Sequence, residues 1–469
     1  MLKKNDQITL DFTDITNLGF GVAKHDGMVI FASGAIPGDR AIVKIIKVNK
    51  SYAIGRIEKL LVSSENRTSD RCSNQPCKSC AYKELRYEQE IKLKESTVRS
   101  AFVHEGLSEV EILPVVASPK HFEYRNKAQY PISTNKDGEY VIGFFAPKSH
   151  RVTEARYCPL APRTFGEIID TLADFFKKYK ISVYDEESGK GLLRHVYLRR
   201  GEISGEILLT LVINGSSLPH SDELTELIRA RFSSVVGILL NVNKKNTNVI
   251  LGDEFINLFG VDHIYDTLAG VRLKISAASF YQVNHDAAEL LYKKARELAD
   301  LKKDDTLLDL YCGAGSIGLS MAEDCKELIG IEIVESAVVC ATENAKNAGL
   351  SNAKFYTGDA ADAEKLLDHA EEKMGKKITP NVIVLDPPRA GCDEKLINFT
   401  ASLSPQRIVY VSCNPSTLAR DVKIFRALGY RPSAVTPFDL FPATGHVESV
   451  VCLTRSDKAT RYNALRRVI

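Results

Sequence analysis

The segment Thr306–Leu319, TLLDLYCGAGSIGL, joins a short apolar run to a turn that is rich in glycine. The apolar run predicts a buried strand. The glycines that follow let the backbone approach a ligand closely where a helix begins. Asp309 adds a carboxylate just before the turn. A strand, a glycine-rich turn and a helix in this order predict the ligand-binding start of an α/β sheet.

From about residue 287, helical and extended patterns alternate toward the C-terminus. We expect helices at 287–301, 316–325 and 335–349 and strands at 306–312, 327–333 and 353–359. Two further apolar runs end at Asp386 and Cys413, and a last run begins near Glu448. This alternation indicates a doubly wound, mostly parallel sheet, whose ligands bind beyond the carboxyl ends of the strands. The residues after each strand are therefore the candidates for a functional site.

The composition describes a globular protein of ordinary character. The chain has 469 residues, which is enough for two or three domains. Its formal net charge is +2, so local patches must attract any anionic partner. The first residues, MLKKNDQITL, do not read as a secretory signal, and no run approaches the roughly 18 apolar residues that span a bilayer. The ten cysteines are not spaced as a disulfide framework, so we expect a cytoplasmic protein.

The N-terminal part of the chain has a different pattern. Residues 1–60 contain several short strands separated by glycines, which predicts a small β-barrel of the oligonucleotide-binding type. The lysines of this region either face phosphate or lie on a solvated strand edge; they are Lys44, Lys47 and Lys50. We expect residues 61–265 to form a central α+β domain with a cysteine cluster. Residues 266–469 would then form the C-terminal α/β domain, with a Rossmann-like sheet.

Acidic residues follow the second and third strands of the predicted sheet. Glu332 lies about twenty residues after Gly313, where a carboxylate can bind ribose hydroxyls. Asp359 is placed to contact an adenine. The glycine pattern alone also fits a nicotinamide dinucleotide. Asp309, Asp359 and the position of the unit in the C-terminal half favour S-adenosylmethionine.

Cys413 lies in the stretch VYVSCNPSTLARD (409–421), where an apolar strand ends and a helix begins. Asn414-Pro415 interrupts the strand, and Ser416 can cap the helix. The positive end of the helix dipole favours the reactive thiolate. The same position also suits a small, buried, unreactive side chain.

Two carboxylates complete the set of strand-end residues. Asp386 is followed by two prolines that rigidify the chain, although it could also serve as a helix N-cap. His446 and Glu448 lie at the start of the last strand, where Glu448 could equally be an exposed carboxylate. A thiolate from Cys413 that adds to C6 of uracil would activate C5 for methylation, and Glu448 could then remove the C5 proton. Asp386 would hold the polar edge of the pyrimidine.

The combination of these motifs resembles a known family. DLYCGAGSIGL, DPPRAG, SCNPSTLARD and GHVESVV are similar to motifs of the S-adenosylmethionine-dependent RNA uridine-5 C-methyltransferases. The likeness extends over nearly the whole chain through YRNKAQYP, LRHVYLRRG, NTNVILG and SFYQVN. It implies that Cys413 is the nucleophile and Glu448 the general base. The cofactor contacts that it implies are Gln282, Tyr311, Glu332 and Asp386, beside the glycine turn at Gly313.

The resemblance also bears on the RNA that is methylated. The first 60 residues resemble the TRAM domain of that family, an RNA-binding barrel found in the members that act on ribosomal RNA. We therefore expect 23S ribosomal RNA as the substrate and a monomeric enzyme that does not bind membranes. The alternatives are a uridine-5 methyltransferase of transfer RNA and a non-catalytic RNA-binding factor of ribosome assembly. The presence of both Cys413 and Glu448 argues against the non-catalytic alternative.

Four cysteines in the first third of the chain suggest a metal site. Cys72, Cys77 and Cys80 form a C-x4-C-x2-C pattern, and Cys158 follows in RYCPL. These ligands suit a [4Fe–4S] cluster or a structural zinc ion, and unligated thiols are the third reading. The resemblance favours [4Fe–4S], with a role in holding the fold or positioning RNA. The sequence departs from the family here, because the first gap is one residue shorter than usual and Lys78-Ser79 replaces a common Gly-Gly.

Overall fold

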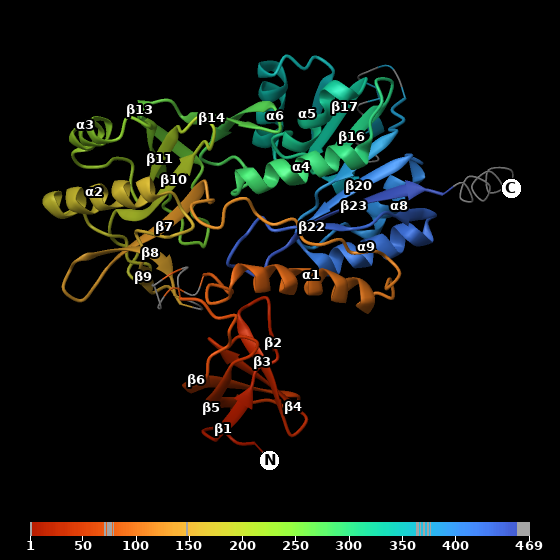
Figure 1. The fold of residues 1–469 in the computed structure, drawn as a ribbon. Helices are drawn as coiled ribbons and strands as arrows, with labels where there is room; N and C mark the ends of the chain where they lie inside the picture. Colours follow the sequence, from red (N-terminus) through yellow and green to blue (C-terminus); the bar gives the residue numbers. More distant parts are fainter. Residues whose placement is uncertain are drawn as a thin grey trace.

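The computed structural model describes residues 2–69, 72, 77, 79–146, 149–362, 365, 367–368, 371–372, 375 and 377–456. Figure 1 shows three regions: an N-terminal sheet in red, a central sheet in orange, yellow and green, and a C-terminal sheet with its helices in teal and blue. The central and C-terminal regions are in contact, because Leu208 and Leu239 of the first pack in one core with Leu291 of the second.

The N-terminal region is a six-stranded sheet with the order β1-β5-β6-β4-β3-β2. Its strands are β1 (Gln7–Asp11), β2 (Asp14–Ile15), β3 (Phe20–His25), β4 (Met28–Ser33), β5 (Arg40–Val48) and β6 (Tyr52–Val62). Ile30 and Ala32 of β4 point into the same core as Val43 and Ile45 of β5, as the alternating pattern of a half-buried strand requires. The all-β prediction is confirmed. The pairing follows an open path, so the region is a half-barrel sheet and not the complete barrel that we expected.

The central region contains a seven-stranded sheet with the order β13-β12-β11-β10-β7-β8-β9. Its strands are β7 (Lys127–Thr134), β8 (Tyr140–Phe145), β9 (Val152–Glu154), β10 (Leu193–Arg200), β11 (Ile207–Ile213), β12 (Val235–Val242) and β13 (Glu254–Gly260). Two helices, α2 (Arg163–Tyr179) and α3 (Ser221–Arg231), pack on it. Ile168 and Phe176 of α2 share a core with Val196 and Leu198 of β10. The residues that alternate with them, His195, Tyr197 and Arg199, therefore face away from α2.

A hairpin of β14 (His263–Leu268) and β15 (Val271–Ser276) connects the central sheet to helix α4 (His285–Ala299). Asn284 caps this helix, because its side chain accepts a hydrogen bond from the backbone N–H of Ala287 at 3.2 Å. The backbone of Asn126, just before β7, donates to the carbonyl of Val283. The start of α4 is thus fastened to the central sheet.

The C-terminal sheet has the order β18-β17-β16-β19-β20-β23-β21, with β22 beside β23. Its strands are β16 (Thr306–Leu310), β17 (Glu327–Glu332), β18 (Ala353–Thr357), β19 (Val382–Leu385), β20 (Arg407–Ser412), β21 (Tyr430–Pro432), β22 (Thr436–Phe438) and β23 (Glu448–Arg455). The helices between them are α5 (Ser316–Met321), α6 (Glu335–Asn347), α8 (Glu394–Ser402) and α9 (Pro415–Ala427), with short 3-10 turns at Ala322–Asp324 and Ala360–Asp362. Strands β16 to β20 pair in parallel, whereas β23 is antiparallel to β20. This confirms the doubly wound sheet.

Alternate residues of these strands belong to two cores on opposite faces of the sheet. Leu307 and Leu328 lie in the core that includes α4 and α5. Leu308 and Ile329 lie in the core that includes α8 and α9. A strand that is buried on both faces is a continuous apolar run, which is what TLLDL and ELIGIE show.

Helix α1 (Tyr87–His104) packs on the C-terminal sheet, although it precedes the central sheet in the chain (Figure 1). Val98 and Phe102 are buried in the core that contains Leu418 and Phe425 of α9. The stretch 61–265, which we predict as one central domain, thus contributes to the cores of both the central and the C-terminal regions. Although α1 has 18 residues, it is polar, and among the described residues no helix is both long and apolar enough to cross a membrane.

Candidate active site

Cys413 and Glu448 are brought together by the pairing of β20 with β23. The two strands are antiparallel, and Ser412 pairs with Ser449. Cys413 follows Ser412 and Glu448 precedes Ser449, so the two residues lie opposite each other at the end of this ladder. Cys413 is half-buried, and Glu448 is only 7% exposed. The predicted nucleophile and the predicted base therefore meet at the carboxyl edge of the sheet.

Charged groups around Cys413 act on both of these residues. Burial raises the pKa of the Cys413 thiol to about 11, and the carboxylates of Glu448 and Asp386 raise it further, while Arg389 lowers it. Burial also raises the pKa of Glu448 to about 8, again with Asp386 adding to the effect and Arg389 opposing it. The pKa of Asp386 rises to about 7 through burial. Three acidic groups thus share a site in which Arg389 favours the ionised forms of Cys413 and Glu448.

The loop that carries Arg389 is fastened to the turn that carries Cys413. The carbonyl of Arg389 accepts hydrogen bonds from the Asn414 side-chain amide at 3.0 Å and from the Thr417 hydroxyl at 3.4 Å. Arg420 of α9 donates to the carbonyls of Ala390 and Cys392 at 3.0 Å each. The segment after Asp386 and the start of α9 therefore form one hydrogen-bonded unit.

A buried carboxylate, that of Asp421, stabilises this hydrogen-bonded unit. Asp421 of α9 accepts hydrogen bonds from the Tyr410 hydroxyl at 2.6 Å and from the backbone N–H of Cys392 at 2.9 Å. Arg420 forms an ion pair with the same carboxylate. The side chain of Asp421 is fully buried, so these partners satisfy a charge that would otherwise be costly. The sequence analysis did not identify Asp421 or Arg420, although both lie in the quoted motif SCNPSTLARD.

The glycine turn after β16 is held by two carboxylates. Asp309 accepts a hydrogen bond from the backbone N–H of Gly318 at 3.0 Å. Glu332 accepts one from the N–H of Gly313 at 3.1 Å. Burial raises the pKa of Asp309 to about 8, with neighbouring carboxylates adding to the shift and the Gly318 N–H opposing it. Glu332 is therefore at the glycine turn, as predicted, and Asp309 braces the helix that follows it.

The predicted cofactor residues Gln282, Tyr311 and Asp359 surround the same turn. The hydroxyl groups of Tyr292, on α4, and Ser316 form a hydrogen bond of 2.8 Å. The side chain of Gln282 affects the pKa of Tyr292, so Gln282 lies next to this pair. Tyr311 adopts φ of 65°, a conformation that is uncommon outside glycine. Asp359 is exposed after β18 and contributes to the raised pKa of Tyr311. Sequence analysis missed Tyr292, which reads as an ordinary core residue of an amphipathic helix.

The N-terminal sheet also reaches the catalytic loop. A Cβ atom at Gly445 would lie 2.3 Å from the carbonyl oxygen of Asn17, so only glycine fits between the two backbones. Asn17 belongs to the loop between β2 and β3, and Gly445 lies three residues before Glu448. His446 lies between Gly445 and Glu448 in the sequence and is exposed. Partial burial and the nearby Arg389 lower its pKa.

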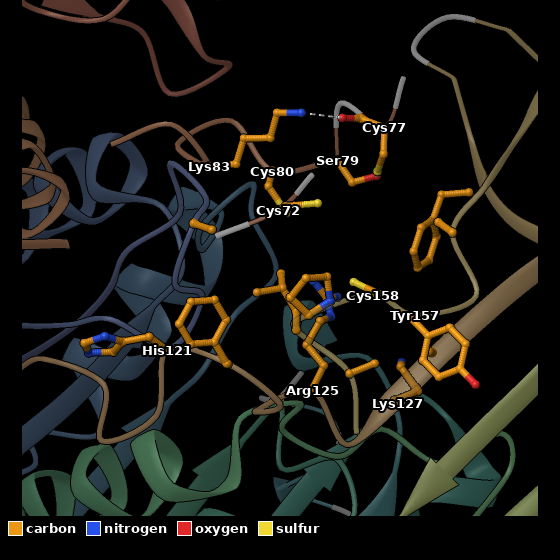
Figure 2. Close-up of a pocket in the computed structure, with 18 of the residues that line it drawn as sticks. Cys72, Cys77, Ser79, Cys80, Lys83, His121, Arg125, Lys127, Tyr157 and Cys158 are labelled. Atoms are coloured by element: carbon orange, nitrogen blue, oxygen red, sulfur yellow. Dashed lines mark hydrogen bonds between the residues drawn. The ribbon is translucent and has the colours of Figure 1, made fainter. Parts of the chain in front are cut away.

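The four early cysteines line one cavity of about 270 Å³ (Figure 2). None of them is in a disulfide. Burial raises the pKa of Cys80 to about 12, and the other three cysteines raise it further, which shows that the four thiols are neighbours. Their side chains surround the cavity without converging, and within the described ranges no group of three or more Cys, His, Asp or Glu is arranged to hold a metal ion. The predicted iron–sulfur ligand set is thus gathered in one place but not shown as a metal centre.

The rest of this cavity is basic. Its lining includes Lys83, Arg125 and Lys127. Burial lowers the pKa of Lys127 to about 8, and the nearby guanidinium groups of Arg199 and Arg125 lower it further. Thiolates carry negative charge, so a set of thiolate ligands would relieve this accumulation of positive charge. The chemistry of the lining therefore fits an anionic metal–thiolate group.

Two family models and several relatives match this chain. A family model described as tRNA (Uracil-5-)-methyltransferase matches residues 86–456, and a TRAM domain model matches residues 2–57. The chain is 40% identical over 460 residues to an uncharacterized RNA methyltransferase of Bacillus cereus, covering 97% of this chain and 98% of the relative. It is 37% identical over 454 residues to an uncharacterized RNA methyltransferase of Clostridium tetani, covering 97% of each.

A solved structure also matches this chain over almost the chain's full length. It is the tRNA (uracil-54, C5)-methyltransferase of Pyrococcus abyssi in complex with S-adenosyl-L-homocysteine, with a TM-score of 0.76 and 28% identity. The alignment covers 95% of this chain and 100% of that protein. The chain therefore belongs to the tRNA (uracil-5-)-methyltransferase family: it is an S-adenosylmethionine-dependent enzyme that methylates uracil in RNA at C5.

Proposed function

We propose that Cys413 forms a covalent bond to C6 of the target uridine and that Glu448 removes the proton from C5 after methylation. The observation that carries this proposal is the register of β20 and β23, which sets the two residues opposite each other beside the glycine turn. A thiol and a carboxylate on opposed residues of one strand pair can act on adjacent carbon atoms of one ring.

The chemistry follows from the roles of these side chains. The Cys413 thiolate adds to C6, and the electron pair of the C5–C6 bond moves to make C5 a nucleophile. S-adenosylmethionine, when bound at the glycine turn, supplies the methyl group that C5 takes up. Glu448 then accepts the C5 proton, the C5–C6 double bond re-forms, and the Cys413 sulfur leaves. Asp386 is placed to hold the polar edge of the pyrimidine.

The first step requires the Cys413 thiol to lose its proton. With pKa values of about 11 for Cys413 and about 8 for Glu448, both groups are largely protonated at neutral pH in the ligand-free site. Arg389 is exposed and lowers the pKa of both. Any closer approach of its guanidinium to the thiol in the RNA complex favours the thiolate that the first step needs.

We propose the remaining strand-end residues as cofactor contacts. Glu332 binds ribose hydroxyls, Asp359 contacts the adenine, and Gln282 and Tyr311 flank the cofactor at the turn beginning with Gly313. Their support is that all of them surround one turn at the carboxyl edge of the sheet, where doubly wound folds bind ligands.

A mechanism-based trap tests the nucleophile. Ribosomal RNA transcribed with 5-fluorouridine should form a denaturant-stable adduct with the wild-type protein in the presence of S-adenosylmethionine, because fluorine at C5 cannot leave as a proton. Cys413→Ala should form none while still binding RNA. Cys452→Ala, which changes a buried cysteine farther along β23, is the matched control and should form the adduct. An adduct with Cys413→Ala, or none with the wild type, overturns the proposal.

We propose 23S ribosomal RNA as the substrate. Its support is the N-terminal TRAM domain, which matches residues 2–57. Transfer RNA is a second candidate, because the similar structure from Pyrococcus abyssi is of a tRNA (uracil-54, C5)-methyltransferase. Mass mapping of 5-methyluridine in both RNAs, from cells with and without the gene, separates the two. Loss from 23S RNA alone supports the proposal, and loss from transfer RNA alone replaces it.

We also propose that Cys72, Cys77, Cys80 and Cys158 hold a [4Fe–4S] cluster. Four thiols that line one cavity with three cationic side chains support it. The cluster would supply bonds between segments that are remote in sequence, and so would stabilise the packing of the N-terminal and central regions. None of the catalytic steps above passes through it.

A further inference from the structure

A second cavity, of about 530 Å³, lies on the central sheet at the ends of β7, β8 and β10. Its lining includes Phe145 of β8, Tyr184 of the segment between α2 and β10, and Arg194 and His195 of β10. It shares no lining residue with the cysteine cavity. Neither the strand-end motifs nor the cysteine pattern accounts for it.

Strand β10 runs from this cavity to the segment that carries Gln282. His195, Tyr197 and Arg199 alternate with Val196 and Leu198, which pack toward α2. Arg199 donates a hydrogen bond to the carbonyl of Ser279, in the segment that leads to Gln282. Arg199 lies four residues after His195, about 13 Å along β10. The cavity is therefore about one strand length from the segment that leads to Gln282.

Aromatic rings form the walls of the cavity. The ring of Phe145, which is 38% exposed, lies 6.0 Å from the ring of His150 and 6.4 Å from that of His195, both at steep angles. The guanidinium of Arg194 lies 4.4 Å from the ring of Tyr184. Exposed rings and a stacked guanidinium are the surfaces on which unstacked bases are held.

A buried polar atom in the lining lacks a partner. His195 is 7% exposed, and its Nδ1 makes no hydrogen bond within the described part of the chain. Burial lowers the pKa of His195 to about 4, with Arg194 adding to the shift, so the ring is neutral at physiological pH. A neutral imidazole offers one donor and one acceptor. A ligand with a complementary polar edge would satisfy this nitrogen.

The charges of the lining exclude a simple anion site. Arg151 and Arg194 are balanced by the acidic run Asp185-Glu186-Glu187. Glu186 forms an ion pair with His150 at 2.5 Å, and Asp185 accepts a hydrogen bond from the Ser188 N–H at 2.8 Å. A phosphate would meet these carboxylates, whereas a heterocycle that carries both donors and acceptors can pair with both kinds of group. The lining thus matches the edge and face of a nucleobase.

A basic loop next to the cavity can contact the backbone of the same nucleotide. Arg194 donates from Nη1 to the carbonyls of Asn243 at 2.7 Å and Lys245 at 2.9 Å. It thereby fixes the segment with Lys244 and Lys245, whose side chains lie at the surface. Phosphate contacts from such lysines fix the register of a strand, while the base contacts inside the cavity specify it.

We propose that this cavity binds one unstacked nucleobase of the substrate RNA, at a distance from the methylated uridine. The inference rests on the proposed function insofar as RNA is the substrate. Its consequence is that recognition uses two bases, the uridine at Cys413 and a second base held between Phe145 and Tyr184 and contacted by His195.

The first test measures binding of a fluorescein-labelled, ten-nucleotide, random-sequence RNA to the full chain at fixed salt. Phe145→Ala should raise Kd about tenfold or more, because removing one stacking ring typically has an effect of that size. Phe255→Ala is the matched control: this ring is 37% exposed on the edge strand β13 and does not line the cavity. It should leave Kd within about twofold. Equal Kd values for the wild type and Phe145→Ala, with unchanged melting temperatures, overturn the inference.

The second test addresses the base edge. His195→Phe keeps a buried ring but removes both polar atoms, so it should flatten the preference that the wild type shows among oligo(A), oligo(C), oligo(G) and oligo(U). An unaltered preference contradicts a role for His195. The 5-fluorouridine adduct at Cys413 distinguishes failure of this inference from failure of the proposed catalytic function. An intact adduct with unaltered binding in the Phe145 and His195 variants refutes only the second base site, whereas absence of the adduct in the wild type refutes the proposed catalytic function.

Discussion

The side-chain amide of Asn414 donates a hydrogen bond to the carbonyl of Arg389 across 3.0 Å, and so joins the turn of Cys413 to the loop that follows Asp386. The two residues follow different strands of the sheet, β19 and β20. Their bond holds the backbone of Arg389 next to the turn of Cys413, and the guanidinium of Arg389 lowers the pKa of the thiol. The reactivity of Cys413 therefore depends on a residue outside its own turn.

Arg420→Ala should lower kcat about ten- to a hundredfold with little change in cofactor binding, because small displacements of catalytic groups have effects of that size. The variant removes two hydrogen bonds that hold Ala390 and Cys392. Lys423→Ala is the control on the same helix, since it removes only an exposed ion pair with Glu105. Single-turnover methylation and calorimetric binding of S-adenosylhomocysteine would measure the two effects. Equal rates for both variants would show that the tether is dispensable.

Glu448→Gln should fail at a later step than Cys413→Ala. Methylation of C5 precedes removal of its proton, so this variant should accumulate a covalent RNA–protein complex that carries the methyl group. Radiolabelled S-adenosylmethionine and denaturing gels would detect the complex. Normal turnover by Glu448→Gln would assign proton removal to another group or to water.

The raised pKa of Asp309 predicts a pH dependence of stability. Its pKa is 3.8 when unperturbed and about 8 in the fold, so the native state binds more protons than the unfolded state between these values. The contribution of Asp309 to stability is therefore complete below about pH 4 and is lost as the pH rises toward 8. Asp309→Asn removes this dependence. Relative to wild type, it should gain at least about 1 kcal/mol of unfolding free energy between pH 5 and pH 8.

Urea unfolding of both proteins without ligand provides the measurement, and groups common to both cancel in the difference. A difference that is the same at pH 5 and pH 8 would show that Asp309 is ionised in the native protein throughout this range.

Protein purified without oxygen should be brown and contain about four iron and four sulfide per chain if the cysteine site holds a [4Fe–4S] cluster. Cys158→Ser should lose the colour as completely as Cys80→Ser, because each ligand holds one corner. Cys340→Ser, a half-buried cysteine of α6, should keep it. Loss of the cluster should also lower the melting temperature, since its bonds join remote segments. Colourless protein with one zinc would replace the cluster with a zinc site, and protein with no metal would remove both.

The C-terminal sheet could be predicted from sequence because its signals are local. TLLDL and VIVL are continuous apolar runs, and the glycines at 313, 315 and 318 mark the turn directly. The same signals identified Cys413 and Glu448 as strand-end residues. Their pairing could not be derived from them, because it depends on the antiparallel register of β20 and β23.

The packing of helix α1 on the C-terminal sheet could not be predicted from the sequence. It reads as a polar, solvated helix, yet Lys94 is buried in ion pairs with Glu90 at 2.8 Å and with Asp439 at 2.6 Å. Asp439 is far away in the sequence, so its carboxylate, which neutralises Lys94, is invisible to any local pattern. The cavity lined by Phe145, Tyr184 and His195 could not be predicted for the same reason, because these residues come from separate segments.

The contact between Asn17 and Gly445 limits how this protein could be recombined. Because the two backbones meet where no side chain fits, the N-terminal sheet is not an interchangeable module that can be exchanged between relatives at residue 62. A chimera would need to inherit the β2–β3 loop and the 443–446 segment from the same parent. Selection on the β2–β3 loop is consequently constrained by the geometry of a loop encoded more than four hundred codons away.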